Sequence, residues 1–147
     1  MAHWQILRMV ELFLVGIGTG NPEHITIQAR RAIEEAGLIL IPYKGSEKSE
    51  LVDVRLKICK EIIRGKKTKI VQFDLPSRDL SYSYQEGVKK WHDNVASVWS
   101  STIRENCSED TKVAFLIWGD PSLYDSSLRI AERLKPMPKI QVFAGIT

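Results

Sequence analysis

Five short apolar segments alternate with stretches of helical periodicity, and this alternation limits the possible folds more than any other property of the sequence. Each segment is nearly continuous in apolar character and is bounded by glycine, proline or charged residues, as is typical of strands buried on both faces. The apolar segments are residues 11–17, 38–41, 69–73, 113–118 and 140–143. We therefore predict an α/β fold, a three-layer domain in which helices cover both faces of a five-stranded parallel sheet.

The stretches between these segments carry apolar side chains three or four residues apart, which is the period of an amphipathic helix. They predict helices at residues 25–36, 50–64, 84–105 and 122–134. In the second of these, Cys59 falls on the apolar face, so we expect its side chain in the core. In the third, His92 falls on the polar side and is expected to be exposed.

The composition excludes several classes of protein. With 147 residues, of which 44% are hydrophobic, the chain is long enough for one domain with its own core. The 21 lysines and arginines are mixed with 18 acidic residues and form no basic stripe interleaved with aromatic side chains, so no nucleic-acid partner is expected. No apolar run approaches the ~18 residues of a membrane span, so no membrane segment is expected either.

The cysteines and the other potential metal ligands are scattered along the chain. Cys59 and Cys107 lack the paired spacing of a zinc or redox site, and we predict that no metal is bound. Free thiols of this kind are typical of a reducing compartment, so we predict a cytoplasmic protein.

A glycine-rich segment follows the first predicted strand. Residues 16–22 have the sequence G-I-G-T-G-N-P, in which glycines permit positive φ and close approach of a ligand to the backbone. Ligands of open parallel sheets lie beyond the carboxyl ends of the strands, which is where this segment falls. The dinucleotide fingerprint G-x-G-x-x-G would need glycine at Asn21, so the alternative of a dinucleotide-binding oxidoreductase is disfavoured. A ligand loop and a simple tight turn both remain open.

The segment after the fourth predicted strand, residues 118–124, has the sequence W-G-D-P-S-L-Y and also allows two interpretations. Asp120 could be the N-cap and Pro121 the first residue of the following helix, with no ligand involved. Alternatively, Gly119 exposes its backbone and Asp120 presents a carboxylate at the ligand edge of a central strand. The residues alone do not decide between a helix cap and a binding loop.

Three motifs together resemble those of the tetrapyrrole methylase family. Residues 16–22, followed by Ile25 and Thr26, resemble the G-x-G-x-G-(D/N)-P loop of that family, and residues 119–121 resemble its G-D-P loop. Residues 144–147 resemble its P-G-I-(S/T) segment, with Ala144 in place of the commoner proline. The resemblance extends over residues 9–147 and implies S-adenosylmethionine as cofactor. Carried over position by position, it implicates Thr19, Trp118, Gly119, Asp120, Leu123 and Thr147 in binding the cofactor.

The resemblance is strongest to the members of the family that methylate precorrin-5. Further matching segments are residues 18–26, 41–49, 73–79 and 118–126, and the residue types at Thr19 and Trp118 differ from those of most relatives. This resemblance implies methyl transfer to C1 of precorrin-5 with release of acetate. Other corrin or tetrapyrrole methylases and relatives of diphthine synthase are the alternatives. No catalytic residue is assigned, because Asp79 or another carboxylate could equally assist the deacetylation.

Corrin precursors are anionic tetrapyrroles with many carboxylates, so basic residues on the loops after the second and third strands are candidate substrate ligands. They are Lys44, Lys48 and Arg78. Each of them could also be an ordinary solvated surface charge. His24, next to the glycine-rich segment, is a weaker candidate for approach to the substrate.

The family fold implies the strand order 3-2-4-1-5, two α/β domains with the cofactor between them, and a homodimer at full length. Residues 1–8 are expected to be a leader or foreign sequence, and residues 9–147 the first domain, with the second domain missing. We therefore expect the 147-residue chain alone to be inactive. A remnant that serves only in protein association is the non-catalytic alternative.

Overall fold

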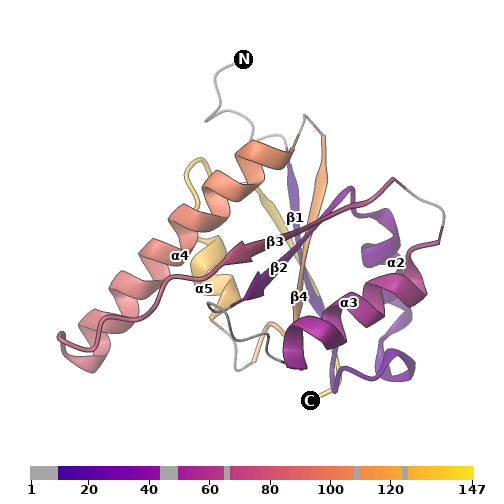
Figure 1. Ribbon diagram of the computed structural model, residues 1–147, viewed down its shortest axis with the longest axis horizontal. Coiled ribbons are helices and arrows are strands. Elements are labelled where there is room, and N and C mark those ends of the chain that lie inside the picture. The colour runs from indigo at the N-terminus through magenta and orange to yellow at the C-terminus, as the bar shows by residue number, and fades with distance from the viewer. Residues whose placement is uncertain (1–9, 44–49, 65–66, 108–109, 124–125) are drawn as a thin grey trace.

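The computed structural model describes residues 10–43, 50–64, 67–107, 110–123 and 126–147. Strands and helices alternate along the chain, as the apolar pattern predicts (Figure 1). In order they are β1 (Glu11–Gly16), the short 3-10 helix η2 (Pro22–His24), α2 (Ile27–Glu35), β2 (Leu38–Tyr43), α3 (Glu50–Ile62), β3 (Lys69–Asp74), α4 (Tyr84–Asn106), β4 (Lys112–Ile117), α5 (Ser127–Ala131) and β5 (Lys139–Phe143).

The five strands form one sheet in the order β3-β2-β4-β1-β5, and every neighbouring pair is parallel. The predicted fold class, strand number and strand order are thereby confirmed. β2 pairs with β4 only from Leu38 to Leu40, whereas it pairs with β3 as far as Tyr43. Where the β2–β4 ladder has ended, Arg55 of α3 donates from Nε to the carbonyl oxygen of Leu116 at 2.8 Å. The guanidinium thus satisfies a strand carbonyl beyond the end of that ladder.

Helices cover both faces of the sheet because successive strand residues point to opposite sides. Leu12 and Leu14 of β1 pack with α4 and α5 in one cluster of buried residues. Phe13 and Val15 pack with α2 and α3 in the other. These side chains are at most 2% exposed, and burial of each contributes roughly 1.5–3 kcal/mol, so β1 belongs to both halves of the core.

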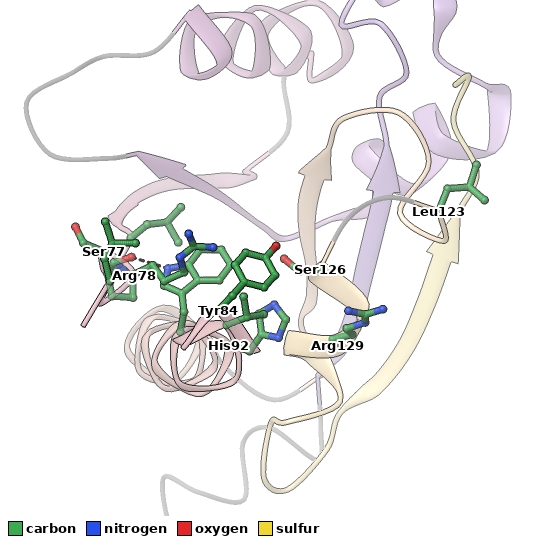
Figure 2. A pocket seen from close by; sticks show the side chains of 12 residues that line it. Ser77, Arg78, Tyr84, His92, Leu123, Ser126 and Arg129 are labelled. Carbon is green, nitrogen blue, oxygen red and sulfur yellow. Dashed lines mark hydrogen bonds between the residues drawn. The ribbon is translucent and has the colours of Figure 1, made fainter. Parts of the chain in front are cut away.

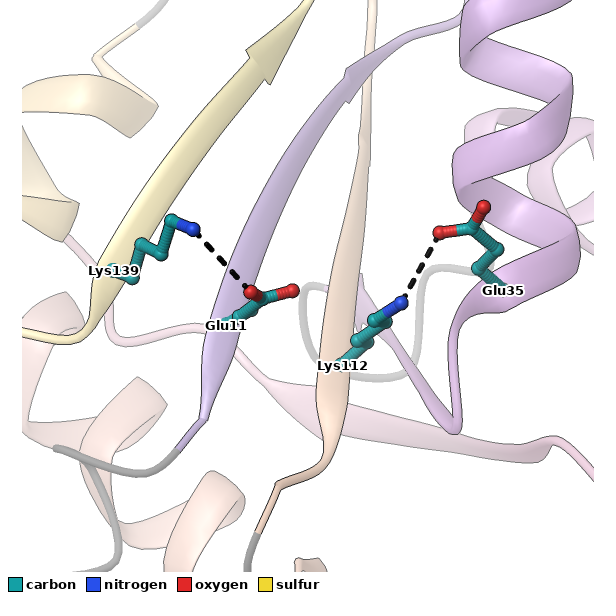
Figure 3. A network of polar contacts seen from close by, with 4 residues as sticks. All are labelled: Glu11, Glu35, Lys112 and Lys139. Atoms are coloured by element: carbon teal, nitrogen blue, oxygen red, sulfur yellow. Dashed lines mark hydrogen bonds and ion pairs between the residues drawn. The ribbon is translucent and has the colours of Figure 1, made fainter.

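Ion pairs join the elements at the amino ends of the strands. Glu11 of β1 lies 3.6 Å from Lys139 of β5, and Lys112 of β4 lies 3.3 Å from Glu35 of α2 (Figure 3). Because these side chains are largely solvent-exposed, each pair contributes at most about 1 kcal/mol. The opposite, carboxyl edge of the sheet carries the glycine motifs.

The last predicted helix, residues 122–134, is wrong in extent, because α5 begins only at Ser127. Asp120 is not its N-cap and Pro121 is not its first residue. Instead, residues 120–123 form a turn in which the Leu123 N–H donates to the Asp120 carbonyl at 3.1 Å. The Asp120 carboxylate also accepts from the N–H and hydroxyl of Ser122, and such local bonds compete with helix formation.

The predicted exposure of His92 is also wrong, since its side chain is only 4% exposed. The side of α4 that carries His92 faces α5, whose Arg129 lies close enough to influence the imidazole. Tyr84, at the start of the predicted apolar stripe, is 73% exposed because the first turns of α4 extend past the edge of the sheet (Figure 1). Cys59 is buried in the core, as predicted.

Candidate functional site

The site lies at the carboxyl ends of the parallel neighbours β1 and β4, from which the chain continues to opposite faces of the sheet. The chain leaves β1 toward α2 on one face and leaves β4 toward α5 on the other. Such a switch point is the usual ligand crevice of an open parallel sheet. Here the two loops join through a short antiparallel bridge, in which the Gly18 N–H donates to the Gly119 carbonyl at 3.2 Å and the Gly119 N–H donates to the Gly18 carbonyl at 3.0 Å.

The loop after β5 closes against both of these loops. A Cβ on Gly16 would lie 2.6 Å from the Gly119 oxygen and 2.7 Å from the Gly145 nitrogen, so only glycine permits this approach. The hydroxyl of Thr26 donates to the carbonyl of Ala144 at 3.3 Å and ties the third loop to the start of α2. Residues 16–22, 118–123 and 144–147 are hereafter called the three-loop cluster.

The backbone of Gly119 is less crowded than that of the other glycines in the described cluster. Its φ of +60° is in the left-handed region, and the space that a Cβ would take is bordered, among described atoms, by the Ile146 oxygen and Thr147 Cγ2 at 3.9 Å. An added Cβ would make only ordinary van der Waals contacts here. Among the glycines of the described cluster, Gly119 is the one at which such a Cβ would meet no atom closer than 3.9 Å.

Trp118, in the loop after β4, packs against the loop after β1. A Cβ on Gly20 would come within 2.5 Å of Trp118 Cη2, and the φ of Gly20 is +87°. The indole Nε1 is buried and has no hydrogen-bond partner in the part of the chain that the structure describes. Because a buried donor left unpaired costs about 1–3 kcal/mol, Trp118 Nε1 is suited to donate to a polar ligand.

Thr19 lies at the tip of the first loop, where it is exposed. Its hydroxyl is hydrogen-bonded to Nδ1 of His24 at 2.6 Å and also accepts from the Asn21 N–H at 3.2 Å. Asn21 in turn caps η2 by accepting from the Glu23 N–H at 2.9 Å. His24 thus has a local partner in Thr19, which the sequence did not indicate.

The remaining candidates for cofactor binding lie on the same edge. Asp120 is half-buried in its turn, and Leu123 is 57% exposed. Thr147 is exposed beside Gly119. The fold therefore places all six predicted residues on the three-loop cluster, although they lie as far apart in sequence as Thr19 and Thr147.

The candidate substrate ligands fall in a different place. Arg78 lies in the loop after β3, with its guanidinium carbon 5.1 Å from the centre of the Tyr84 ring. Both residues line a pocket of about 590 Å³ that Leu123 also borders (Figure 2). Lys44 and Lys48 lie outside the described residues. Arg129 of α5 also lines this pocket, and sequence reasoning missed it because its position depends on how α5 packs on α4.

Metal-binding and membrane-spanning features are both absent from the part of the chain that the structure describes. Among these described residues, no three His, Cys, Asp or Glu side chains gather in a way that could hold a metal ion. Within the same residues, every helix is too short or too polar to span a bilayer.

Comparison with known proteins identifies the fold. Residues 11–147 match the family of tetrapyrrole (corrin/porphyrin) methylases. The chain belongs to the tetrapyrrole methylase family. Within this family it is 40% identical, over 144 residues, to a precorrin-6A synthase (deacetylating) from Sinorhizobium. That alignment covers 95% of this chain and 55% of the relative, which confirms the resemblance to the precorrin-5 methylases.

Solved structures of tetrapyrrole methylases share the architecture. A cobalamin-synthesis-related protein (CobF) from Corynebacterium diphtheriae superposes with a TM-score of 0.72 at 38% identity, over 95% of this chain and 54% of its own. A uroporphyrin-III C-methyltransferase from Thermus thermophilus, crystallised with S-adenyl homocysteine, superposes with a TM-score of 0.56 at 21% identity, over 93% and 45% of the two chains. The latter supports the fold alone. The chain spans about half the length of these relatives.

Proposed function

We propose that this chain is the cofactor-binding part of an S-adenosylmethionine-dependent methyltransferase of cobalamin biosynthesis. The reaction is methylation of precorrin-5 at C1, with release of acetate, to give precorrin-6A. The observation that carries the proposal is the three-loop cluster, in which all three family motifs meet at the switch point between β1 and β4. The 40% identity to a precorrin-6A synthase supports the choice of substrate.

The residues of the cluster fit such a cofactor. The uncrowded backbone at Gly119, the Nε1 of Trp118, which has no partner among the described residues, and the Asp120 carboxylate offer acceptors and donors. They suit a molecule that carries ammonium, carboxylate and hydroxyl groups. The residues that would hold it are Thr19, Trp118, Gly119, Asp120, Leu123 and Thr147. When bound, S-adenosylmethionine supplies an electrophilic methyl group.

The contribution of the chain is mainly positioning. Methyl transfer from a sulfonium to an electron-rich carbon needs in-line alignment more than acid or base strength. The Gly18–Gly119 bridge and the close packing of Gly16 on Gly119 fix the loops against each other through the backbone, so they need little rearrangement on binding. Asp79 holds a turn by accepting from the Ser81 N–H at 2.9 Å. The hydrogen bond from the Ser81 side chain, followed by this backbone bond, lowers the pKa of Asp79. No base for the deacetylation is assigned.

The proposal also includes a cytoplasmic location and a homodimeric assembly. A cytoplasmic location is supported by the free thiols of Cys59 and Cys107. Homodimerisation at full length and the absence of nucleic-acid and membrane partners are proposed from the family resemblance and the composition.

The test uses this chain extended to the length of its relatives. Calorimetric titration with S-adenosylhomocysteine should show binding, and single-turnover assays should convert precorrin-5 into a methylated, deacetylated product. Failure of either assay with folded protein would refute the proposal. Methylation of another corrin precursor but not of precorrin-5 would assign the chain to a different member of the family.

A parallel assay on the 147-residue chain tests the predicted need for a second domain. A cofactor held between two domains loses contacts when one is absent, and each ~1.4 kcal/mol lost weakens binding tenfold. We expect S-adenosylhomocysteine to bind the short chain at least tenfold more weakly, with no turnover. Comparable turnover by both chains would show that the shorter one is self-sufficient.

A further inference from the structure

The pocket of about 590 Å³ lies between the loop after β3, α4 and α5 (Figure 2). Leu123, a member of the three-loop cluster, is also one of its lining residues. Its volume is within the range of small-molecule sites, roughly 300–1,000 Å³. The lining residues are Leu75, Pro76, Ser77, Arg78, Leu80, Tyr84, Val88, Trp91, His92, Leu123, Ser126 and Arg129.

The charged groups of this lining are of one sign. Arg78 and Arg129 contribute two guanidinium groups, and the described lining contains no carboxylate. Two of the described carboxylates close by in sequence have partners outside the pocket. Asp79 accepts from the Ser81 N–H at 2.9 Å, and Asp93 pairs with Arg133 at 3.0 Å. The pocket is therefore suited to an anion.

The wall that carries Arg78 is braced from two sides. Its guanidinium stacks on Tyr84 at 5.1 Å, a cation–π arrangement that limits the movement of a long side chain. Trp91 donates from Nε1 to the Pro76 carbonyl at 2.8 Å and so ties the loop to α4. Figure 2 shows Arg78 and Tyr84 on one side of the pocket and Arg129 on the other, with His92 between them.

His92 adds no charge of its own at neutral pH. Burial, followed by the positive charges of Arg133 and Arg129, lowers the pKa of its imidazole below the ordinary value. Between the two arginines the surface is aromatic and aliphatic, from Trp91 and Val88. A matching ligand has a flat apolar body and carboxylates at separate points of its edge.

We propose that Arg78 and Arg129 bind two different peripheral carboxylates of the tetrapyrrole substrate, and that the macrocycle edge between them lies on Tyr84 and Trp91. This inference rests on the proposed function, because it assigns the substrate side of the same site. Leu123 then marks the boundary between the substrate pocket and the cofactor loops. Arg129 becomes a determinant of substrate binding that the sequence did not indicate.

The test measures binding of uroporphyrin, a fluorescent polycarboxylated tetrapyrrole, by the extended chain. The variants are Arg78→Gln, Arg129→Gln and the double substitution. Arg30→Gln is the matched control, because Arg30 is an exposed arginine of α2 on the opposite face of the sheet, paired with Glu34 at 3.2 Å. Titration of every variant with S-adenosylhomocysteine shows whether the cofactor loops are intact. Thermal melts of the same variants show whether they are folded.

Each single substitution should weaken uroporphyrin binding roughly tenfold and the double substitution roughly a hundredfold, in line with charge-assisted bonds of about 1.5 kcal/mol. Coproporphyrin, which carries fewer carboxylates, should bind the wild-type chain more weakly than uroporphyrin does. Its affinity should also fall less when the arginines are replaced. Added salt should weaken binding of the wild-type chain more than that of the double variant. Arg30→Gln should leave uroporphyrin affinity unchanged, and all variants should keep their affinity for S-adenosylhomocysteine.

Equal uroporphyrin affinity of the wild-type chain and the double variant would overturn the assignment. So would failure of the wild-type chain to bind uroporphyrin while it still binds S-adenosylhomocysteine. If uroporphyrin binding depends on both arginines but S-adenosylhomocysteine does not bind, the pocket assignment stands and the proposed methyltransferase fails. If the glutamine substitutions abolish binding of both ligands and lower the melting temperature, the variants Arg78→Lys and Arg129→Lys decide, because they keep the positive charge. Lysine variants that retain most of the uroporphyrin affinity support the assignment. Folded lysine variants that lose it overturn the assignment.

Discussion

The Cα of Gly16 faces the carbonyl oxygen of Gly119 so closely that an added Cβ would lie 2.6 Å from it. Gly16→Ala should therefore push the loops after β1 and β4 apart and lower the free energy of unfolding by about 1–3 kcal/mol. Gly37→Ala is the matched control, because a Cβ at Gly37 would meet its nearest neighbour, Thr111 Cγ2, at an ordinary 3.4 Å. Urea denaturation of both variants checks this, and equal stability would refute the close approach.

Asp120→Ala should weaken binding of S-adenosylhomocysteine by at least tenfold in the extended chain. The stability loss should be only about 1 kcal/mol, since the substitution removes two bonds to Ser122 in an exposed turn and no helix cap. Asp120→Asn keeps an acceptor for Ser122 but removes the charge, so it separates the two effects. Calorimetry and thermal melts provide the measurements. Unchanged affinity in both variants would leave Asp120 with a structural role alone.

Trp118→Phe and Trp91→Phe should have opposite consequences. Trp118 Nε1 has no partner among the described residues, so replacing it removes an unpaired donor and should leave the melting temperature nearly unchanged while weakening cofactor binding. Trp91 Nε1 donates to the Pro76 carbonyl at 2.8 Å, so its replacement should cost about 1 kcal/mol of stability and spare cofactor binding. If Trp118→Phe binds S-adenosylhomocysteine as well as the wild-type chain does, its indole N–H does not contact the cofactor.

Burial of His92 should make the fold less stable in acid. Its pKa is lowered in the folded chain from the ordinary 6.5, first by burial and then by Arg133 and Arg129. The unfolded chain therefore binds more protons, and stability falls as the pH drops from about 6.5 toward the lowered value. His92→Phe should make the unfolding free energy less dependent on pH in this window. An identical pH dependence in wild type and variant would show that His92 does not titrate differently on folding.

The two thiols should be slow to react in the folded chain. Burial raises the pKa of Cys59 to about 12 and that of Cys107 to about 11, so little thiolate exists at pH 8. Iodoacetamide labelling followed by mass spectrometry should modify Cys107, which is only half-buried, before Cys59, and both should react rapidly in urea. Fast labelling of Cys59 under native conditions would contradict its place in the core.

The sheet was predictable because its strands follow a simple rule. Strands covered on both faces are apolar throughout, and β1 and β4 fulfil this over nearly their whole length. The residue at which a helix begins, and the side of a helix that is buried, were less predictable where tertiary contacts determine them. Asp120 and Pro121 carry an ordinary helix-start signal, but the bonds of Asp120 to Ser122 stabilise a turn instead. His92 looks polar-facing until α5, which is only a short helix, packs over it.

The site was predictable only in part, because the sequence shows its motifs but not how they pack together. Its three motifs lie on separate loops, and the resemblance to a family indicated that they belong together. No motif showed that the three loops meet through glycine backbones in contact. Nor did any motif show that Arg129 lies opposite Arg78. Those depend on how distant segments pack in three dimensions, which spacing along the chain does not reveal.

The central position of β1 also matters for how the chain emerges from a ribosome. β1 is made first, yet its hydrogen-bonding neighbours are β4 and β5, which begin only at Lys112 and Lys139. No local hairpin can shelter its apolar residues in the meantime, and closing such long loops slows folding. A nascent chain of this protein therefore exposes an aggregation-prone strand until β4 has been made, and holding chaperones should be found on it until β4 has left the exit tunnel.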